Sequence, residues 1–144
     1  MIVALGQAAG SIKDRVAKGV AAELPSLVSL YKHFHANPEL SFMEAETAKR
    51  LAAELRNAGL TVSTGIGGHG LVGVLKNGDG PTLLIRADMD GLPVREETGL
   101  PHASKKQMAD DLGNMVYTMH ACGHDGHMAI LLGAAKVLSD MRDQ

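Results

Sequence analysis

The chain is poor in several kinds of residue, and each shortage excludes something. It has one cysteine, no tryptophan and only 3% aromatic residues among 144. A single cysteine excludes an internal disulfide and leaves the redox compartment open. Cys122 is therefore a buried packing residue, a nucleophile or a metal ligand.

A strong charge of either sign is also missing. Lysine and arginine number 14 against 16 acidic residues, for a formal net charge of -2. This balance provides no bulk field for phosphate backbones or anionic lipid, so we expect neither nucleic acid nor membrane as a partner.

No apolar run reaches the length of a membrane span. Residues 1–10 lack the basic start and long apolar stretch of a secretory signal, although they are compatible with the tail of a trimmed leader. We expect a cytoplasmic protein.

What the chain does have is the composition of an ordinary globular protein. Hydrophobic residues make up 45%, and the mean hydropathy is close to zero. A chain of this length can form one domain with a real core.

Three helices are expected. The sequence Ser11–Asp14 has the form of a capping box, Pro25 is expected to interrupt the helix that starts there, and Asn37-Pro38 to end it. A second capping box at Ser41–Glu44 predicts another helix, which ends near Gly59. A last helix is expected to start close to His124. The apolar faces predicted for the three are Leu27, Leu30, Tyr31 and Phe34; Ala48, Leu51, Ala52 and Leu55; and Met128, Leu131, Ala135 and Leu138.

Between the helices the period changes to that of strands. Alternation from Leu60 to Thr64 and the apolar run Leu71–Leu75 predict two strands around a glycine-rich loop. The run Thr82–Ile85 is apolar enough for a central strand, and we expect Leu60 to Leu100 to form one sheet. A loop at Lys105–Asn114, turning near residues 111–113, then precedes a short strand at Met115–Met119. The fold class predicted is α/β, with a sheet covered by helices.

The stretch His120–His127 is the most informative for chemistry. Thiolate and imidazole are good ligands for zinc-like ions, and Gly123 allows a tight backbone between Cys122 and His124. A helix start at His124 would also favour the thiolate. The alternative is that Cys122 only packs. Two ligands do not complete a site, so others must come from His120, from His127, from the aspartates described next, or from outside the chain.

A second group of chemical interest, Asp88–Pro93, follows the expected central strand. Reactive groups gather beyond the carboxyl ends of strands in α/β sheets. Asp88 and Asp90 could bind a metal, orient a ligand histidine, or raise each other's pKa. An aspartate-rich turn without chemical function is the alternative.

Together these segments resemble a known family. Arg86–Pro93, Glu96–Pro101 and Met119–His127, with the earlier His35–Phe42, are similar to motifs of the amidohydrolase branch of the M20 metallopeptidases, the hippurate hydrolase and indole-acetyl-amino-acid hydrolase group. The likeness extends in the same order from about His33 to Leu138.

The resemblance implies the N-terminal part of a zinc-exopeptidase-like catalytic domain, with a mixed sheet covered by helices. It implies hydrolysis of the amide bond of N-acyl amino acids or similar small conjugates, with divalent metal ions (zinc, manganese, cobalt or nickel), two per full-length subunit. It makes Cys122 and His124 metal ligands, gives Asp88 and Asp90 a supporting or catalytic role, and makes His127 structural or an indirect support of the ligands.

The resemblance also implies that the chain, residues 1–144, is a partial catalytic domain. The family's general base lies in a downstream Glu-Glu pair that Glu96-Glu97 does not match, and its remaining ligands and its dimerisation domain would follow Gln144. We expect the full-length protein to be a homodimer and this chain alone to be inactive. With an unfinished sheet, the chain is expected to aggregate or dimerise.

Two other functional classes are compatible with the residues. A hydrolase could use Cys122 as a nucleophile, with His124 or His120 as its base. A non-catalytic metal-binding or interaction module, or a truncated homologue, would keep the fold without the reaction.

Overall fold

The computed structural model describes residues 11–142, so the question of a trimmed leader at residues 1–10 lies outside the described part of the chain. The described elements are, in order, helices α1 (Ile12–Ala36) and α2 (Ala45–Asn57), strands β1 (Thr61–Ile66), β2 (Gly70–Val74), β3 (Gln107–Ala109) and β4 (Met115–Tyr117), and helix α3 (His124–Asp140). The mixed α/β class expected from the sequence is confirmed.

Helix α1 begins as predicted and continues where it was expected to stop. The capping box at Ser11 and Asp14 is present, and the helix ends at Ala36, before Asn37-Pro38. The prediction that Pro25 interrupts the helix was wrong, because Pro25 lies inside it. A proline costs an interior helix about 3 kcal/mol, and the packing of α1 against α3 outweighs that local penalty.

Helix α2 is capped from a distance. The capping box predicted at Ser41–Glu44 was wrong, because Glu44 occupies the N-cap position without a side-chain hydrogen bond. The buried carboxylate of Glu39 instead accepts a hydrogen bond from the backbone amide of Thr47, at 2.7 Å. A first-turn amide without a helical partner is thereby satisfied by a residue outside the helix. The predicted end of this helix is confirmed, since Gly59 follows it with a φ of 84°.

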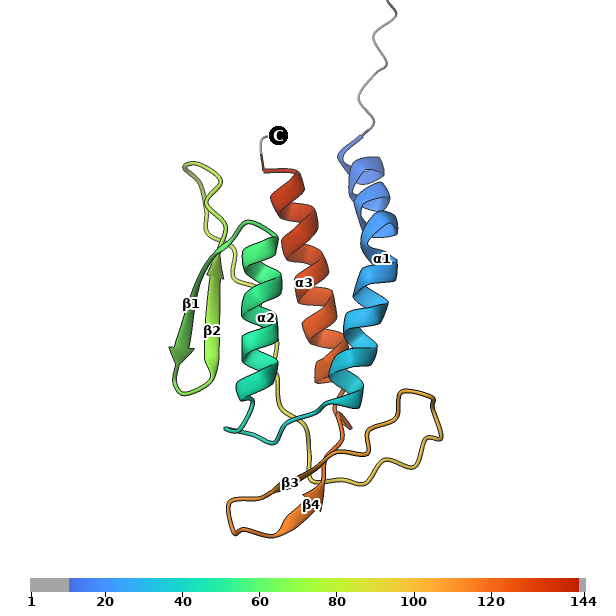
Figure 1. Ribbon diagram of the computed structural model, residues 1–144. Coiled ribbons are helices and arrows are strands. Elements are labelled where there is room, and N and C mark those ends of the chain that lie inside the picture. Colours follow the sequence, from blue (N-terminus) through green and yellow to red (C-terminus); the bar gives the residue numbers. More distant parts are fainter. Residues whose placement is uncertain (1–10, 143–144) are drawn as a thin grey trace, which may run out of the picture.

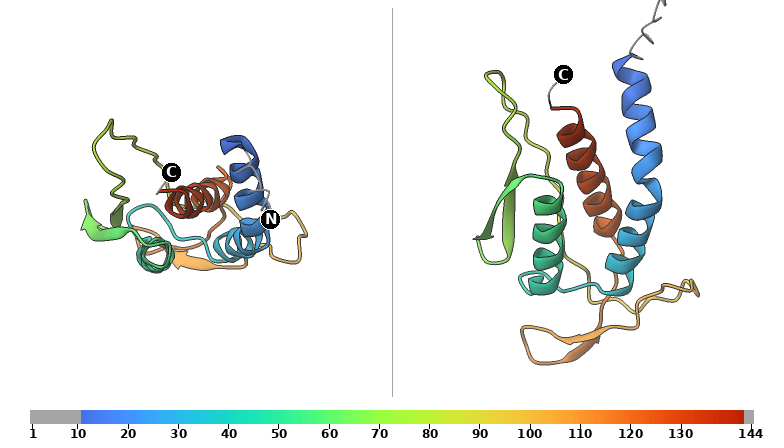
Figure 2. Two further views of the ribbon diagram at one scale, coloured as in Figure 1. Left: turned by 90° about the horizontal axis from the view of Figure 1, so that it is seen from above. Right: turned by 45° about the horizontal axis from the view of Figure 1, so that its top comes forward.

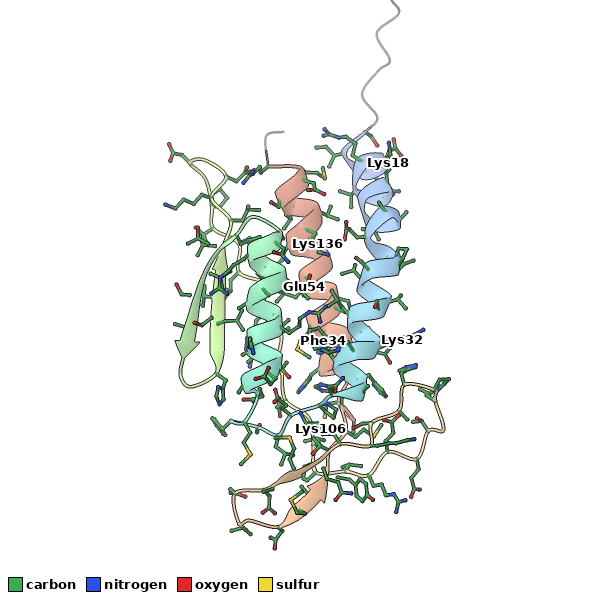
Figure 3. The ribbon with its side chains drawn as sticks, viewed as in Figure 1. Lys18, Lys32, Phe34, Glu54, Lys106 and Lys136 are labelled. Carbon is green, nitrogen blue, oxygen red and sulfur yellow. The ribbon has the colours of Figure 1, made fainter. Side chains whose placement is uncertain are left out.

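The core lies where the three helices meet. Its buried members are Leu30, Phe34, Leu51, Leu55, Met128 and Leu132. The helices stand side by side, with α3 beside both α1 and α2 (Figures 1 and 2). In Figure 3, Phe34 points inward among the helices and Lys32 points away from them. The predicted faces of α1 and α2 are confirmed at their buried positions, Leu30, Phe34, Ala48, Leu51, Ala52 and Leu55.

The face predicted for α3 was confirmed in part. Leu131 and Ala135 are partly buried and packed against the core. Met128 is buried, but Leu138 is 46% exposed, and Leu132 and Val137 are buried instead. Gly133 also lies in the contact with α1, where a Cβ atom would come within 2.7 Å of a Leu27 methyl group. Small residues allow the two helices to pack closely.

The strands form two antiparallel pairs. Strands β1 and β2, both expected, pair with Thr61 opposite Val74. Strands β3 and β4 pair with Gln107 opposite Tyr117. Met115–Tyr117 confirms most of the predicted last strand, whereas β3 falls in a stretch that was expected to be loop. The turn between them, near residues 111–113, is confirmed.

The predicted central strand was wrong. Residues 82–85 form no strand, and Leu83 and Leu84 are 78% and 83% exposed. Residues 60–100 consequently do not hold together as one sheet: the only ladder in this stretch is β1–β2. A central strand requires a neighbour on each side, and the described residues provide none for this segment. None of the described helices combines the length and apolar character needed to cross a bilayer.

Candidate metal centre

Two backbone segments are held together below the helices, where α1 ends and α3 begins (Figure 1). The amide of Gly91 donates to the carbonyl of Glu39 at 2.6 Å. Leu92 and Met119 exchange two backbone hydrogen bonds, at 2.8 and 3.0 Å. The aspartate segment, 88–93, is therefore fixed between the chain that leaves α1 and the chain that enters α3.

Gly91 is required by this close approach. It is buried, and a Cβ atom at this position would lie 2.9 Å from Cβ of Pro38 and 3.1 Å from a methyl carbon of Thr118. Any larger residue would push Asp90 away from its neighbours.

Asp90 and His124 are in direct contact. Nδ1 of His124 lies 3.0 Å from Oδ1 of Asp90 and 3.0 Å from its backbone carbonyl. The hydroxyl of Ser41 donates to the second carboxylate oxygen, Oδ2, at 2.9 Å. The carboxylate is thus held from one side by Ser41 while it holds the imidazole on the other.

This contact fixes the tautomer of His124. Both acceptors of Asp90 face Nδ1, so that nitrogen carries the proton and Nε2 keeps its lone pair. Nε2 has no hydrogen-bond partner among residues 11–142, and the ring is only partly buried. Metal-binding histidines are usually held in this way, through the other nitrogen, by a carboxylate or a carbonyl.

Cys122 lies immediately before the helix. Its side chain is exposed, and the N-cap Gly123 has a φ of 77°, in the left-handed region that glycine adopts without strain. The sharp turn brings Cys122 and His124 to the start of α3, as predicted. Within the described part of the chain, no three His, Cys, Asp or Glu side chains are close enough to hold an ion together.

The other predicted site residues lie further out. Asp88 forms an ion pair with Arg86, and its side chain is 40% exposed. His127 is exposed, with its ring centroid 5.9 Å from that of His124. The structure brings Asp90 to His124 and does not bring Asp88 into that contact.

His120 is buried without a partner. Neither of its ring nitrogens makes a hydrogen bond to another described residue, and the residue is 4% exposed. Burial lowers the pKa of His120. The carboxylate of Asp125 and the nearby backbone of Asp90 oppose this shift, and the rings of His124 and His35 add to it. A buried neutral imidazole therefore stands directly before Ala121 and Cys122.

A buried ionic cluster was not predicted from the sequence. Nδ1 of His35 lies 2.6 Å from Oδ2 of Asp125, and Nε2 lies 3.0 Å from Oε1 of Glu96. The three side chains are 7%, 3% and 0% exposed. His35 is separated from its partners by 61 and 90 residues, so no local spacing indicates the contacts. The only available signal was that all three residues fall in the motifs of the resemblance.

Comparisons with known proteins show what the chain is similar to. Residues 84–144 match the family described as Peptidase family M20/M25/M40. The solved structure of an aminohydrolase from methicillin-resistant Staphylococcus aureus superposes with a TM-score of 0.81 and 35% identity, covering 92% of this chain and 33% of that one. The second half of the chain is thus similar to the M20 peptidases.

Two further similar proteins bear on the site. A dinuclear metal-binding peptidase from Bacillus subtilis superposes with a TM-score of 0.73 and 36% identity, over 85% of this chain and 32% of that one. Hippurate hydrolase from Campylobacter jejuni is 44% identical over 124 residues, which are 81% of this chain and 30% of the relative. The chain thus spans about a third of the length of the M20 proteins that it matches.

Proposed function

We propose that this chain supplies one half of a dinuclear metal centre in an amidohydrolase acting on N-acyl amino acids. The observation that carries the proposal is the contact of Asp90 with Nδ1 of His124, which leaves Nε2 without a partner among the described residues, two positions after the exposed thiol of Cys122. The proposal draws further support from the likeness to a dinuclear metal-binding M20 peptidase. The substrate class is taken from the likeness to hippurate hydrolase, whose name denotes an N-acyl amino acid substrate.

The donor set fits a divalent ion of intermediate softness. A Cys122 thiolate and a neutral His124 imidazole are preferred ligands of zinc, cobalt and nickel, and carboxylates added from elsewhere would also suit manganese. Bound metal would supply Lewis acidity toward the scissile carbonyl and its attacking water.

The chain's own residues have separate tasks in this proposal. Cys122 and His124 bind the ions, Asp90 orients His124, and Ser41 orients Asp90. Asp88 keeps a supporting or catalytic role next to the site, where its exposed carboxylate is paired with Arg86. The remaining ligands and the general base lie outside residues 1–144, so the chain is a partial catalytic domain that is inactive alone and belongs to a full-length dimer.

A cysteine nucleophile is the weaker alternative. Its base must hydrogen-bond the thiol. Asp90 holds Nδ1 of His124, which would equally orient a general base. However, no hydrogen bond joins the Cys122 thiol to His124 or to His120 among the described residues. Alkylation of Cys122 would abolish either activity, whereas a chelator would abolish only the metal-dependent one.

The first test is the metal content of the purified, folded chain. Elemental analysis should detect a bound divalent ion in the wild type and its loss in Cys122→Ser and His124→Asn. His33→Asn is the control, because His33 is exposed on α1 and makes no side-chain hydrogen bond to a described residue. It should retain the metal.

Equal metal content in all four proteins would remove Cys122 and His124 from the ligand set. If the folded wild-type chain binds no metal, the half-site is insufficient. The same substitutions would then be measured in the full-length protein, with hydrolysis of an N-acyl amino acid as the readout.

A further inference from the structure

His35 joins three separate parts of the molecule. It lies in the last turn of α1, and its two ring nitrogens contact Asp125 in the first turn of α3 and Glu96 in the segment after Gly91-Leu92. Figure 1 shows these parts meeting at one end of the helices. No other described side chain makes ionic contacts with two segments so far apart in sequence.

Each partner of His35 is itself fully engaged. Glu96 also accepts hydrogen bonds from the hydroxyl of Thr98 and from the backbone amide of Ser104. The other oxygen of Asp125 accepts from the amide of Gly126 at 2.9 Å. The rings of Tyr31 and His102 lie beside His35, with centroids 5.7 and 5.2 Å away. The positions and orientations of the His35, Glu96 and Asp125 side chains are therefore fixed.

Stability alone does not account for such a cluster. Buried ion pairs add little net stability compared with apolar residues of the same volume, because desolvation offsets the attraction. They do, however, fix geometry, since any shift leaves a buried charge unpaired. Asp125 directly follows His124, and Glu96 lies six residues after Asp90. Both segments that form the Asp90–His124 contact are thus anchored to one imidazole.

We propose that His35 is a positioning residue of the metal centre, which sets the start of α3, and with it Cys122 and His124, against the segment that carries Asp90. The metal part of this inference rests on the proposed function, whereas the positioning part does not.

Two substitutions separate the two contacts. The amide nitrogen of asparagine reaches about as far as Nδ1 of histidine, and that of glutamine about as far as Nε2. His35→Asn therefore keeps a donor for Asp125 and loses the contact with Glu96, whereas His35→Gln does the reverse. His33→Gln is the control, because His33 is exposed on the same turn and makes no side-chain hydrogen bond to a described residue.

The first readout requires no metal. In His35→Gln, hydrogen exchange should accelerate at the amides of Gly126 and His127, which are hydrogen-bonded to Asp125 and Gly123, and the rate of Cys122 alkylation should change. In His35→Asn, the acceleration should fall on the amide of Ser104, which Glu96 holds. His33→Gln should match the wild type at all of these positions.

The second readout is the binding of Co²⁺, with the absorption band of cobalt bound to thiolate as its signature. Affinity in His35→Gln should fall about tenfold, the lower end of the range for losing an indirect support of a ligand. It should fall less in His35→Asn.

Folded His35 variants with unchanged exchange and alkylation would overturn the proposal. So would acceleration spread evenly over the chain, since that indicates general destabilisation. If the His35 variants do not fold, Asp125→Asn and Glu96→Gln, which keep the size of each partner, should give the two local patterns separately. If the wild-type chain binds no Co²⁺, the half-site alone is insufficient and the cobalt readout moves to the full-length protein, while exchange and alkylation still decide the role of His35.

Discussion

At the scale of the residue, the side chains of the site are held in orientation by hydrogen bonds from their neighbours. Asp90 prevents His124 from turning, and Ser41 does the same for Asp90. The sequence left three roles open for the aspartates, and the hydrogen bond to His124 matches one of them, the orientation of a histidine. That choice could not be made from sequence, because Asp90 and His124 are 34 positions apart and their contact depends on how the backbone folds between them.

Gly91→Ala should be destabilising. The added methyl group would lie 2.9 Å from Cβ of Pro38 with no flexible neighbour to move, and overpacking of this kind costs about 1–3 kcal/mol. Urea unfolding should show the loss. Gly126→Ala is the control, because nothing lies within 4 Å of the new methyl group and alanine favours the helix. Equal stability of the two variants would mean that the contact around Gly91 is loose.

At the scale of the element, prediction from the local sequence was correct where the residues that stabilise an element lie within the same segment. Ser11 caps α1 with Asp14, and the alternation after Leu60 gave β1. Prediction failed where a distant residue decides. Glu39 caps α2 in place of Ser41, and packing on α3 carries α1 through Pro25. Helix packing also determined which face of α3 is buried, since its apolar residues allow more than one stripe.

The contribution of the His35 contacts between α1 and α3 to the free energy of unfolding should depend on pH. Burial lowers the pKa of His35, but the hydrogen bonds and charges of Glu96 and Asp125 together outweigh burial, so the pKa is raised above its ordinary value of 6.5. The folded state then binds the proton more tightly than the unfolded chain. This contribution to the free energy of unfolding is fully present below about pH 6.5 and is lost as the pH rises through the raised pKa.

Comparison with His35→Gln isolates this contribution from other titrating groups. Urea unfolding of both proteins across a pH series should show a difference in free energy of unfolding that shrinks as the pH rises above about 6.5. A difference that stays constant over that range would show that His35 does not gain a proton on folding.

At the scale of the whole molecule, the structure has a finished helical core and an unfinished sheet. Leu83, Leu84 and Ile85 are exposed, and so are Val72 and Val74 of β2. Neighbouring exposed apolar side chains of this kind favour association. Residues 82–85 are apolar, as expected of a central strand. A segment forms a strand only when another strand pairs with it, and no partner strand for these residues occurs among the described residues.

We therefore expect the isolated chain to dimerise or aggregate. Light scattering at increasing protein concentration should show a mass above that of the monomer, 15.1 kDa. Leu84→Lys should lower the tendency to associate, while Ile130→Lys, which places the same charge at an exposed apolar position of α3, should change it less. A monodisperse wild-type monomer would contradict this expectation.

The contacts of His35 also bear on when the centre forms. They close loops of 61 and 90 residues, and contacts between such distant positions form late because the chain must first lose the entropy of both loops. During synthesis, Cys122 emerges before most of α3 exists to dock against α1. The thiol stays exposed in the folded chain, so what the docking of the last helix supplies is its fixed place before His124. Metal capture should therefore become selective only once that helix has docked.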